Sequence, residues 1–389
     1  MGTWARVLGV AAVAGTGLAV VSGAAGWDTA HRVLAGVALP PLAALAAVAW
    51  VSARRLLAPS LVALAAFGLA ALLTGRDVHL AFASLAFAAT AYTSALTFRG
   101  SAEQGPWRDY WTLTKPRIMS LLLLTGACGV FVGAGGVPQA SVFAFTIAGL
   151  ALACGGASAL NHYLDRDIDQ LMGSRTSARP VASGRVAPER ALEYGIALSA
   201  LSFVLLDSLV NLPTALLALA GNLFYVLVYT RFLKRSTPQN IVIGGAAGAV
   251  PPLVGYAGAA GHLGLAALLM FAIVFVWTPP HFWALALMIK EHYARAGVPM
   301  LPVARGDSET ARQIVRYTVV LVAVTLLPVA LGTFGLVYGI AALLLGAAFL
   351  WLAVELRRTM ERVVAVKLFH FSLLYLALLF VAMALDSVL

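Results

Sequence analysis

The stretch "NHYLDRDIDQLMGSRTSARP", residues 161–180, concentrates charge in a chain that is otherwise apolar. Asn161, Asp165 and Asp169 follow one another at intervals of four residues in this stretch. On a helix, that spacing places all three side chains on one face, whereas Asp167 points away from them. The segment therefore predicts a polar stripe at the end of a helix that leaves an apolar environment.

The composition indicates what that environment is. The chain has 389 residues, of which 61% are hydrophobic and 11% charged, and its mean hydropathy is +0.91. Soluble domains contain less apolar and more charged sequence, so we expect an all-α polytopic membrane protein. In a soluble chain, a net charge of +10 would suggest binding to nucleic acid. In a membrane protein, the positions of the positive residues instead indicate the membrane orientation, and no nucleic-acid partner is expected. Cys128 and Cys154 lie in apolar runs and indicate neither a disulfide nor a metal site.

Apolar runs of about 17 to 25 residues predict membrane-spanning helices along the whole chain. The first run is similar to a secretory signal, but we interpret it as a span because such runs continue to the C-terminus. The predicted spans lie near 7–26, 31–51, 57–74, 78–98, 118–137, 140–160, 191–209, 212–230, 240–259, 264–289, 313–332, 336–354 and 368–386.

The distribution of Lys and Arg predicts the orientation of these spans. With the N-terminus in the cytoplasm, 24 of the 26 Lys and Arg residues lie on the cytoplasmic side, and only Arg32 and Arg76 face outward. The positive-inside rule favours this arrangement. We therefore expect a multi-pass protein of the inner (plasma) membrane with segment 161–190 on the cytoplasmic side.

The polar segment "TFRGSAEQGPWRDYWTLTKPR" (97–117) divides the chain in two. It contains Gly, Pro and charged residues and no apolar helical stripe, which is typical of a linker. The sequence thus predicts a four-helix transmembrane unit over 1–105 and a nine-helix unit over 106–389.

The carboxylates of segment 161–180 predict a cation site. Carboxylates one helical turn apart repel each other, so a positive charge is expected between them. Mg²⁺ is usually held by one or two carboxylates together with phosphate oxygens of a substrate. Asn161, Asp165 and Asp169 are the candidate ligands, and Arg175 and Arg179 would bind the same phosphates. The alternative is a solvated loop whose charges neutralise each other; the one-face spacing at a membrane boundary favours a functional site.

The same segment resembles the first aspartate-rich motif of the UbiA-type intramembrane prenyltransferases, in the version found in heme O synthases. Together the matching pieces are specific, although each alone is weak. The resemblance covers about 106–389, and its other pieces are "YWTLTKPRIMSLLLLTG" (110–126), "YTRFLKRSTPQNIVIGGAAGAVPPLVGY" (229–256), "VWTPPHFWALAL" (276–287) and "YARAGVPMLPV" (293–303).

The resemblance implies a nine-helix prenyltransferase bundle and a Mg²⁺-dependent reaction. A farnesyl group would pass from farnesyl diphosphate to a vinyl group of heme b, and water addition would complete heme O for terminal oxidase biogenesis. The resemblance also implies heme A synthase or terminal oxidase assembly proteins as partners within the lipid bilayer. The implied metal ligands are Asn161, Asp165 and Asp169, and the implied diphosphate ligands are Arg175, Arg179, Lys234 and Arg235.

A histidine in "VWTPPHFWALAL" is the candidate contact to the heme acceptor. By the resemblance, His281 would approach the heme, with Trp277 and Trp283 beside it. Aromatic faces can also stabilise a cation by roughly 0.5 to 2 kcal/mol. The alternative is a structural histidine whose polar atoms are satisfied by the backbone next to Pro279 and Pro280.

The sequence departs from the family at "KEHY" (290–293). Family members usually carry an aspartate immediately before the tyrosine, and here that position is His292. Glu291 is then the only acid nearby, so a second Mg²⁺ site is in doubt. Lys290 is the candidate that would carry part of the charge in its place.

The N-terminal unit resembles one half of a heme A synthase at "WDTAHRVLAGV" (27–37) and "DVHLAFASL" (77–85). His31 and His79 would open two helices that both run inward, so the two imidazoles are expected at the same depth. Such a pair can clamp one heme between helices, and Arg32 and Arg76 would bind its propionates. The alternative is a pair of interfacial histidines near lipid headgroups.

Two other functions fit part of the pattern. A transporter would place polar groups at mid-membrane and contain inverted repeats, and the sequence shows neither clearly. A non-catalytic heme-binding assembly factor would use only the N-terminal unit. Among enzymes, an aromatic or quinone prenyltransferase of the same fold is the alternative, and the pieces at 229–256 and 276–303 argue against it.

Overall fold

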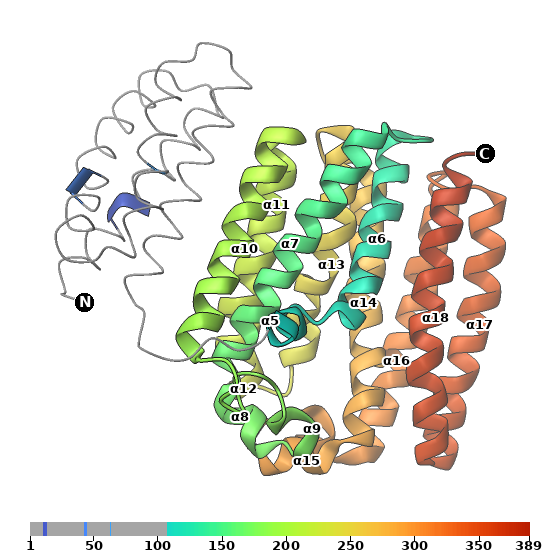
Figure 1. Cartoon of the computed structure of the whole chain (residues 1–389). Helices are drawn as coiled ribbons and strands as arrows, with labels where there is room; N and C mark the ends of the chain where they lie inside the picture. The colour runs from blue at the N-terminus through green and yellow to red at the C-terminus, as the bar shows by residue number, and fades with distance from the viewer. Residues whose placement is uncertain (1–10, 14–42, 45–62, 64–106) are drawn as a thin grey trace.

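The computed structural model describes residues 11–13, 43–44, 63 and 107–389. Within this part of the chain the regular elements are helices, and the long ones run side by side in one bundle (Figure 1). The predicted N-terminal spans near 7–26, 31–51, 57–74 and 78–98 lie outside the described residues, apart from a few positions. The observed architecture confirms the expected all-α class.

Nine helices of the described chain are long and apolar enough to cross a membrane. In chain order they are α6 (Pro116–Ala134), α7 (Ala140–Leu164), α10 (Pro188–Leu209), a composite of α11 (Leu212–Leu223), η2 (Phe224–Leu233) and α12 (Lys234–Ser236), then α13 (Asn240–Ala260), α14 (Leu265–Met288), α16 (Leu301–Ala330), α17 (Leu336–Thr359) and α18 (Arg362–Asp386). The short helices are α5 (Trp107–Leu113), α8 (Arg166–Leu171), α9 (Ser174–Ser177) and α15 (Lys290–Arg295). The protein is therefore a multi-pass membrane protein.

The predicted spans from 118 to 386 agree with these helices, and the differences lie mainly at polar ends. The helix α7 continues to Leu164 and α17 to Thr359, past the predicted ends at 160 and 354. The largest difference is α16, which begins at Leu301 although its apolar run begins at 313. An apolar run marks only the part of a helix inside hydrocarbon, whereas backbone hydrogen bonding continues into the interface. Gly306 interrupts α16 with φ 79° and ψ 169°, where the chain bends.

Small residues bring α6 and α13 into close contact. A Cβ added to Gly129 would lie 2.5 Å from the carbonyl oxygen of Pro252, and one added to Gly133 would lie 2.4 Å from that of Tyr256. Backbones approach this closely only where side chains are absent, which is how helices commonly pack in membranes. The glycines of α6 therefore serve packing, because they let α6 approach the backbone of α13 closely.

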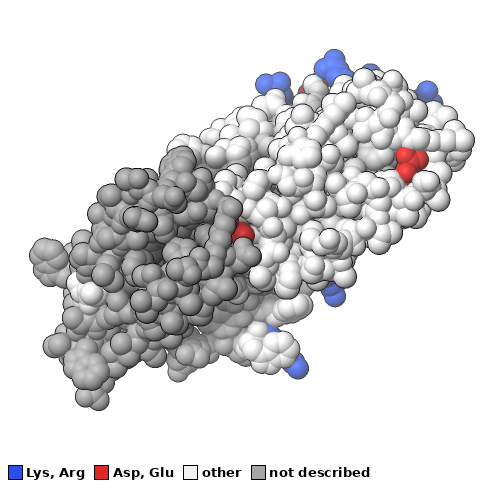
Figure 2. Space-filling model, turned by 90° about the horizontal axis from the view of Figure 1, so that it is seen from above, with Lys and Arg blue, Asp and Glu red and all other residues white. Residues whose placement is uncertain are grey.

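The two ends of the bundle differ in charge. The short helices α8, α9 and α15 and all the long polar connections lie at the lower end in Figure 1. The connections at the other end, 135–139, 210–211, 261–264 and 331–335, contain no Lys or Arg. Viewed from that end, the described surface is almost entirely uncharged, and Lys and Arg emerge only at its outline (Figure 2). The described chain thus carries its cations at one membrane face, as the predicted orientation requires.

Candidate functional site

The polar stripe of segment 161–180 lies at the junction of α7 and α8. Asp165 has φ −91° and ψ 4°, so it ends α7 and precedes α8. Helical hydrogen bonding nevertheless continues through it, because Asp165 N donates to Asn161 O (2.9 Å) and Asp169 N donates to Asp165 O (2.8 Å). The three side chains stay on one face as predicted, and all three are at least 97% buried.

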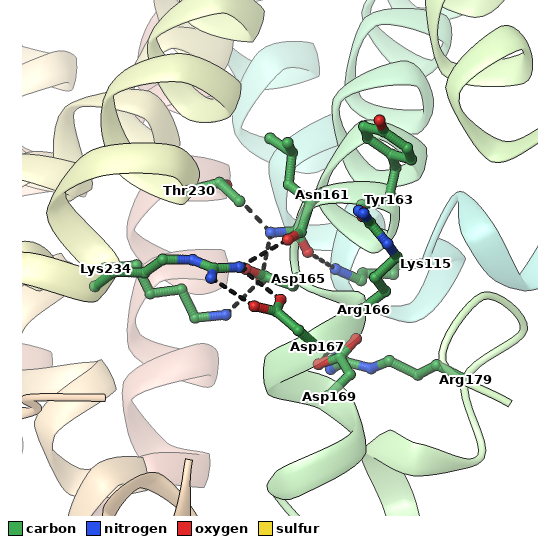
Figure 3. A network of polar contacts seen from close by, with 12 residues as sticks. Lys115, Asn161, Tyr163, Asp165, Arg166, Asp167, Asp169, Arg179, Thr230 and Lys234 are labelled. Atoms are coloured by element: carbon green, nitrogen blue, oxygen red, sulfur yellow. Dashed lines mark hydrogen bonds and ion pairs between the residues drawn. The ribbon is translucent and has the colours of Figure 1, made fainter. Parts of the chain in front are cut away.

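Asn161 joins three segments of the chain. Its side-chain oxygen accepts a hydrogen bond from Lys115 Nζ (2.7 Å). Its amide nitrogen donates to Asp165 Oδ2 (2.8 Å) and to Thr230 Oγ1 (3.1 Å). Because an asparagine amide has distinct donor and acceptor ends, these contacts fix its orientation. Figure 3 shows Lys115 and Lys234 approaching this centre from opposite sides.

Three of the predicted diphosphate ligands contact the aspartates directly. Lys234 Nζ lies 2.5 Å from Asp165 Oδ2, and Arg179 Nη1 lies 2.6 Å from Asp169 Oδ1. Lys234 and Arg235 follow the π-helix η2, whose residue Thr230 also reaches Asn161. The backbone of Arg175 belongs to α9, and its side chain lies outside the described residues.

Arg235 forms a bidentate pair with the outward-facing aspartate. Its two terminal nitrogens each lie 2.7 Å from an oxygen of Asp167, and one of them also donates to Leu164 O. This guanidinium lowers the pKa of Asp167 to about 2. Asp167 is more than half exposed and Arg235 Nη2 is 3.9 Å from Asp165 Oδ1, so Arg235 lies between the exposed aspartate and the buried one.

Each of the two buried aspartates retains one oxygen that accepts no hydrogen bond from the described residues. Asp165 Oδ1 and Asp169 Oδ2 are fully buried and have no hydrogen-bond partner in the described part of the chain. Burial raises the pKa of Asp169, against the opposite effect of the Arg179 guanidinium. Buried oxygens without partners are costly, and hard carboxylate oxygens are the ligands that Mg²⁺ prefers. The residues present therefore fit a divalent cation.

Lys115 is a site residue that the sequence interpretation missed. It precedes Pro116 and has the left-handed backbone conformation, φ 51° and ψ 57°, which is uncommon for a residue with a side chain. Burial, together with the nearby charge of Arg179, lowers the pKa of Lys115 to about 7. Strained backbone of this kind is often found at functional sites. The available signal was the sequence "TKPR", in which a lysine lies next to the start of a span.

The "KEHY" segment forms part of α15, and it places its side chains differently from the expectation. Lys290 Nζ pairs with Asp307 Oδ2 at 2.5 Å, so its charge is matched by an acid that the sequence interpretation did not consider. Glu291 is exposed and lies 3.8 Å from Arg295 on its own helix. His292 packs over Gly173, where an added Cβ would lie 2.7 Å from His292 Cδ2. Asp307 therefore supplies the acid at this position.

His281 is buried between α14 and α18. Its ring stacks against Trp277 (4.4 Å between centroids) and Phe369 (4.8 Å). Its Nδ1 lies 2.6 Å from Ser372 Oγ, and Ser372 Oγ itself donates to Phe369 O. Because a hydroxyl has one hydrogen, Ser372 must accept from Nδ1–H, which leaves the lone pair on Nε2. The histidine is thus held by a side chain, and not by the backbone near Pro279 and Pro280.

The two tryptophans lie on different faces of α14. Trp277 stacks on His281 and donates its indole N–H to Ser372 O (2.8 Å). Trp283 is two residues beyond His281, and two helical residues differ by about 200° in direction. Its ring packs edge-on against Tyr317 of α16, with centroids 5.2 Å apart. The structure thus brings Trp277 to His281 but does not place Trp283 beside it.

Comparison with known proteins identifies the bundle. Residues 122–382 match the sequence model of the UbiA prenyltransferase family. The chain belongs to this family. The matched region contains most of α6 and α18 and every span between them. The residues predicted to bind heme in the N-terminal unit, His31, Arg32, Arg76 and His79, lie outside the described residues.

Several members of the family are similar in sequence to this chain. The protoheme IX farnesyltransferase of Symbiobacterium thermophilum is 53% identical over 281 residues, which cover 72% of this chain and 94% of that protein. The protoheme IX farnesyltransferase of Roseiflexus sp. is 52% identical over 281 residues and 72% of this chain. The match covers 52% of that protein, so the chain spans about half the length of this relative.

A solved structure shows the same fold. It is a UbiA homolog from Archaeoglobus fulgidus bound to GPP and Mg²⁺, with a TM-score of 0.55 and 16% sequence identity. The similarity covers 71% of this chain and 99% of that one. The predicted nine-helix UbiA-type architecture is therefore confirmed for the described part of the chain.

Proposed function

We propose that this prenyltransferase transfers a farnesyl group from farnesyl diphosphate to a vinyl group of heme b and so produces heme O for terminal oxidase biogenesis. The observation that carries the proposal is the pair of buried aspartates, each with one oxygen that accepts no hydrogen bond in the described part of the chain, enclosed by Lys115, Lys234 and Arg179. The acceptor is proposed from the relatives named protoheme IX farnesyltransferase.

The charged residues have complementary roles in this proposal. Asn161, Asp165 and Asp169 would hold Mg²⁺, which when bound neutralises charge on the diphosphate. Lys234 contacts Asp165 and Arg179 contacts Asp169, and both cations are placed to turn toward an entering diphosphate. Arg235, Arg175 and Lys115 would add positive charge around the same group. Lys290 is placed to contribute only if it leaves Asp307.

The reaction is balanced by the two substrates and water. The allylic C–O bond breaks and its electron pair leaves with the diphosphate, whose charge the cationic side chains stabilise. The vinyl π electrons form the new C–C bond, and water adds to the resulting cation and loses a proton. The apolar helices beside the site exclude water from the farnesyl chain, and stacked aromatic rings such as Trp277 favour a nearby cation.

The decisive experiment supplies purified full-length protein with heme b, farnesyl diphosphate and Mg²⁺, followed by mass analysis of the hemes. A heme whose mass has increased by a hydroxyethylfarnesyl substituent is expected. An aromatic acid acceptor in place of heme b tests the alternative of an aromatic or quinone prenyltransferase. Product from that acceptor, with none from heme b, would contradict the proposal.

His281 is proposed to contact the heme through Nε2. Because Ser372 accepts from Nδ1–H, Ser372→Ala should release the ring and weaken heme b binding by about five- to tenfold, the value of one hydrogen bond to a buried group. His281→Ala should weaken binding further, and Trp277→Phe less. Titration of heme b by absorption spectroscopy measures these affinities, and Trp283→Phe is the control on the other face of α14. Equal affinities in the His281→Ala variant and the unmodified protein would exclude the contact.

We propose that the protein lies in the inner membrane with its site on the cytoplasmic side, and the charge asymmetry of the bundle supports this orientation. In a variant lacking Cys128 and Cys154, a cysteine at Ser174 should resist an impermeant thiol reagent in intact cells. A cysteine at His262, in the connection between α13 and α14, should react. Both positions are exposed, so accessibility within the fold does not explain the difference. Labelling at Ser174 but not at His262 would reverse the orientation.

We propose further that segment 1–105 binds a second heme through His31 and His79, on the strength of its resemblance to half of a heme A synthase. Two imidazoles fill both axial positions, so the full-length protein should show a low-spin, six-coordinate absorption spectrum. The His31→Ala, His79→Ala double variant should lose it, and Arg32→Ala or Arg76→Ala should only weaken binding. An unchanged spectrum in the double variant would assign the heme to another site. Such a unit would suit exchange with heme A synthase or terminal oxidase assembly proteins.

A further inference from the structure

A polar cavity, here called the rear cavity, lies at the α7–α8 junction on the face opposite Asn161. Its volume is about 380 Å³, and it is lined by Tyr163, Leu164, Arg166, Asp167, Arg231 and Arg235. Asn161, Asp165 and Asp169 are not part of its wall. Tyr163 is two helical residues beyond Asn161 and therefore points about 200° away from it. The rear cavity is thus lined by residues other than the buried aspartates.

The rear cavity has an excess of positive charge. Three arginines face one carboxylate, and Arg235 is already bonded to that carboxylate, Asp167, and to Leu164 O. Arg166 stacks on Tyr163 at 4.8 Å and uses Nη1 to donate to Tyr163 O; Figure 3 shows the two side chains together. Its other N–H groups remain available. Arg231 is exposed, and no hydrogen bond or ion pair within the described chain engages it.

Both walls of the rear cavity end at the membrane interface. Leu164 is the last residue of the span Ala140–Leu164, and Arg231 and Arg235 end the span Leu212–Ser236. Leu227 lies four residues before Arg231, about one turn deeper in the bilayer on the same side, and is 54% exposed. The guanidinium groups therefore lie at headgroup depth, directly below apolar surface that faces the acyl chains.

We propose that the rear cavity binds an anionic phospholipid. The lipid phosphate would be held by Arg166 and Arg231, since planar guanidinium groups bind phosphate oxygens in pairs. An acyl chain would lie along Leu227. Basic pockets between helix ends on this side of a membrane suit anionic headgroups, and the adjoining apolar surface favours a phosphate attached to a lipid over a soluble one. The inference does not depend on the reaction proposed above.

The test is a lipid titration of the full-length protein in detergent, with bound lipids counted by native mass spectrometry. Phosphatidylglycerol should bind at one preferred site, at least about tenfold more tightly than phosphatidylcholine with the same acyl chains. The Arg166→Gln, Arg231→Gln variant should lose this preference. Arg231→Gln alone, at an exposed position without partners, should weaken phosphatidylglycerol binding about fivefold while leaving the unfolding temperature unchanged.

The matched control is Arg357→Gln, Arg358→Gln, which removes the same charge at the same end of the bundle but from α17. It should retain the lipid preference in full. Equal binding of the two lipids to the unmodified protein would overturn the proposal, as would equal losses in both double variants. Soluble glycerol phosphate should not displace the lipid at millimolar concentration; displacement would show a simple phosphate site in place of a lipid site.

Discussion

Replacing Asp165 or Asp169 by alanine is expected to abolish farnesyl transfer, with turnover falling by about 10³-fold or more, as when a charge-stabilising group is lost from an active site. Each side chain is buried and presents one oxygen that accepts no hydrogen bond within the described chain. Removal of either aspartate would take one ligand from Mg²⁺. It would also leave the paired basic side chain, Lys234 or Arg179, without its carboxylate. Turnover of heme b at saturating Mg²⁺ is the measurement.

Asp167→Ala is the internal control for that experiment. Asp167 is two residues from each of the other aspartates, but it is exposed and pairs with Arg235. Exposed ion pairs contribute little, so turnover should fall by no more than about tenfold. Asp165→Asn keeps the shape of the buried side chain and separates loss of charge from loss of folding. Turnover of Asp169→Ala equal to that of the unmodified protein would remove the metal assignment.

Gly255→Ala is expected to prevent stable folding. The added Cβ would lie 1.9 Å from the carbonyl oxygen of Gly126 and 3.0 Å from the backbone nitrogen of Val130. Both neighbours are backbone atoms of α6, so relief requires the two helices to separate. The loss should reach or exceed about 3 kcal/mol, the upper part of the range for overpacked cores. Thermal unfolding in detergent and the yield of monodisperse protein measure it.

Gly248→Ala is the matched control on the same helix. A Cβ added at Gly248 has no heavy atom within 4 Å outside its own helix, and alanine favours helix over glycine by about 1 kcal/mol. This variant should therefore be as stable as the unmodified protein or slightly more so. If the two variants unfold at the same temperature, close backbone packing between α6 and α13 is not what holds these helices together.

The spans and the stripe of Asn161, Asp165 and Asp169 could be predicted because both are local patterns. Apolar runs and four-residue spacing need only neighbouring sequence. The partners of those residues could not be predicted in the same way. Lys115 is 46 residues from Asn161, Thr230 is 69 residues from it, and the pair Lys290–Asp307 joins separate helices. Such contacts depend on how helices pack, and no periodicity in one sequence specifies them.

The same limit explains the results for the arginines and tryptophans. Arg235 lies at the same end of the bundle as the aspartates, as the sequence predicts. Its bidentate contact with Asp167, however, depends on the geometry of η2 and α12. Trp283 could have been separated from His281 by helical angle alone. The buried hydroxyl of Ser372, which orients His281 from 91 residues away, has no counterpart in the local sequence.

The odd number of spans between Trp107 and Leu389 has a consequence for gene fusion. An odd number of spans places the start of α6 and the end of α18 on opposite membrane faces, with the start of α6 on the side of α8. A fluorescent protein or affinity tag attached after Leu389 would thus lie on the membrane face opposite the aspartates. A unit with an even number of spans that is fused before Trp107 has both of its ends on the same membrane face as Trp107. Units of two or four helices can therefore be exchanged before Trp107 without inverting the enzyme.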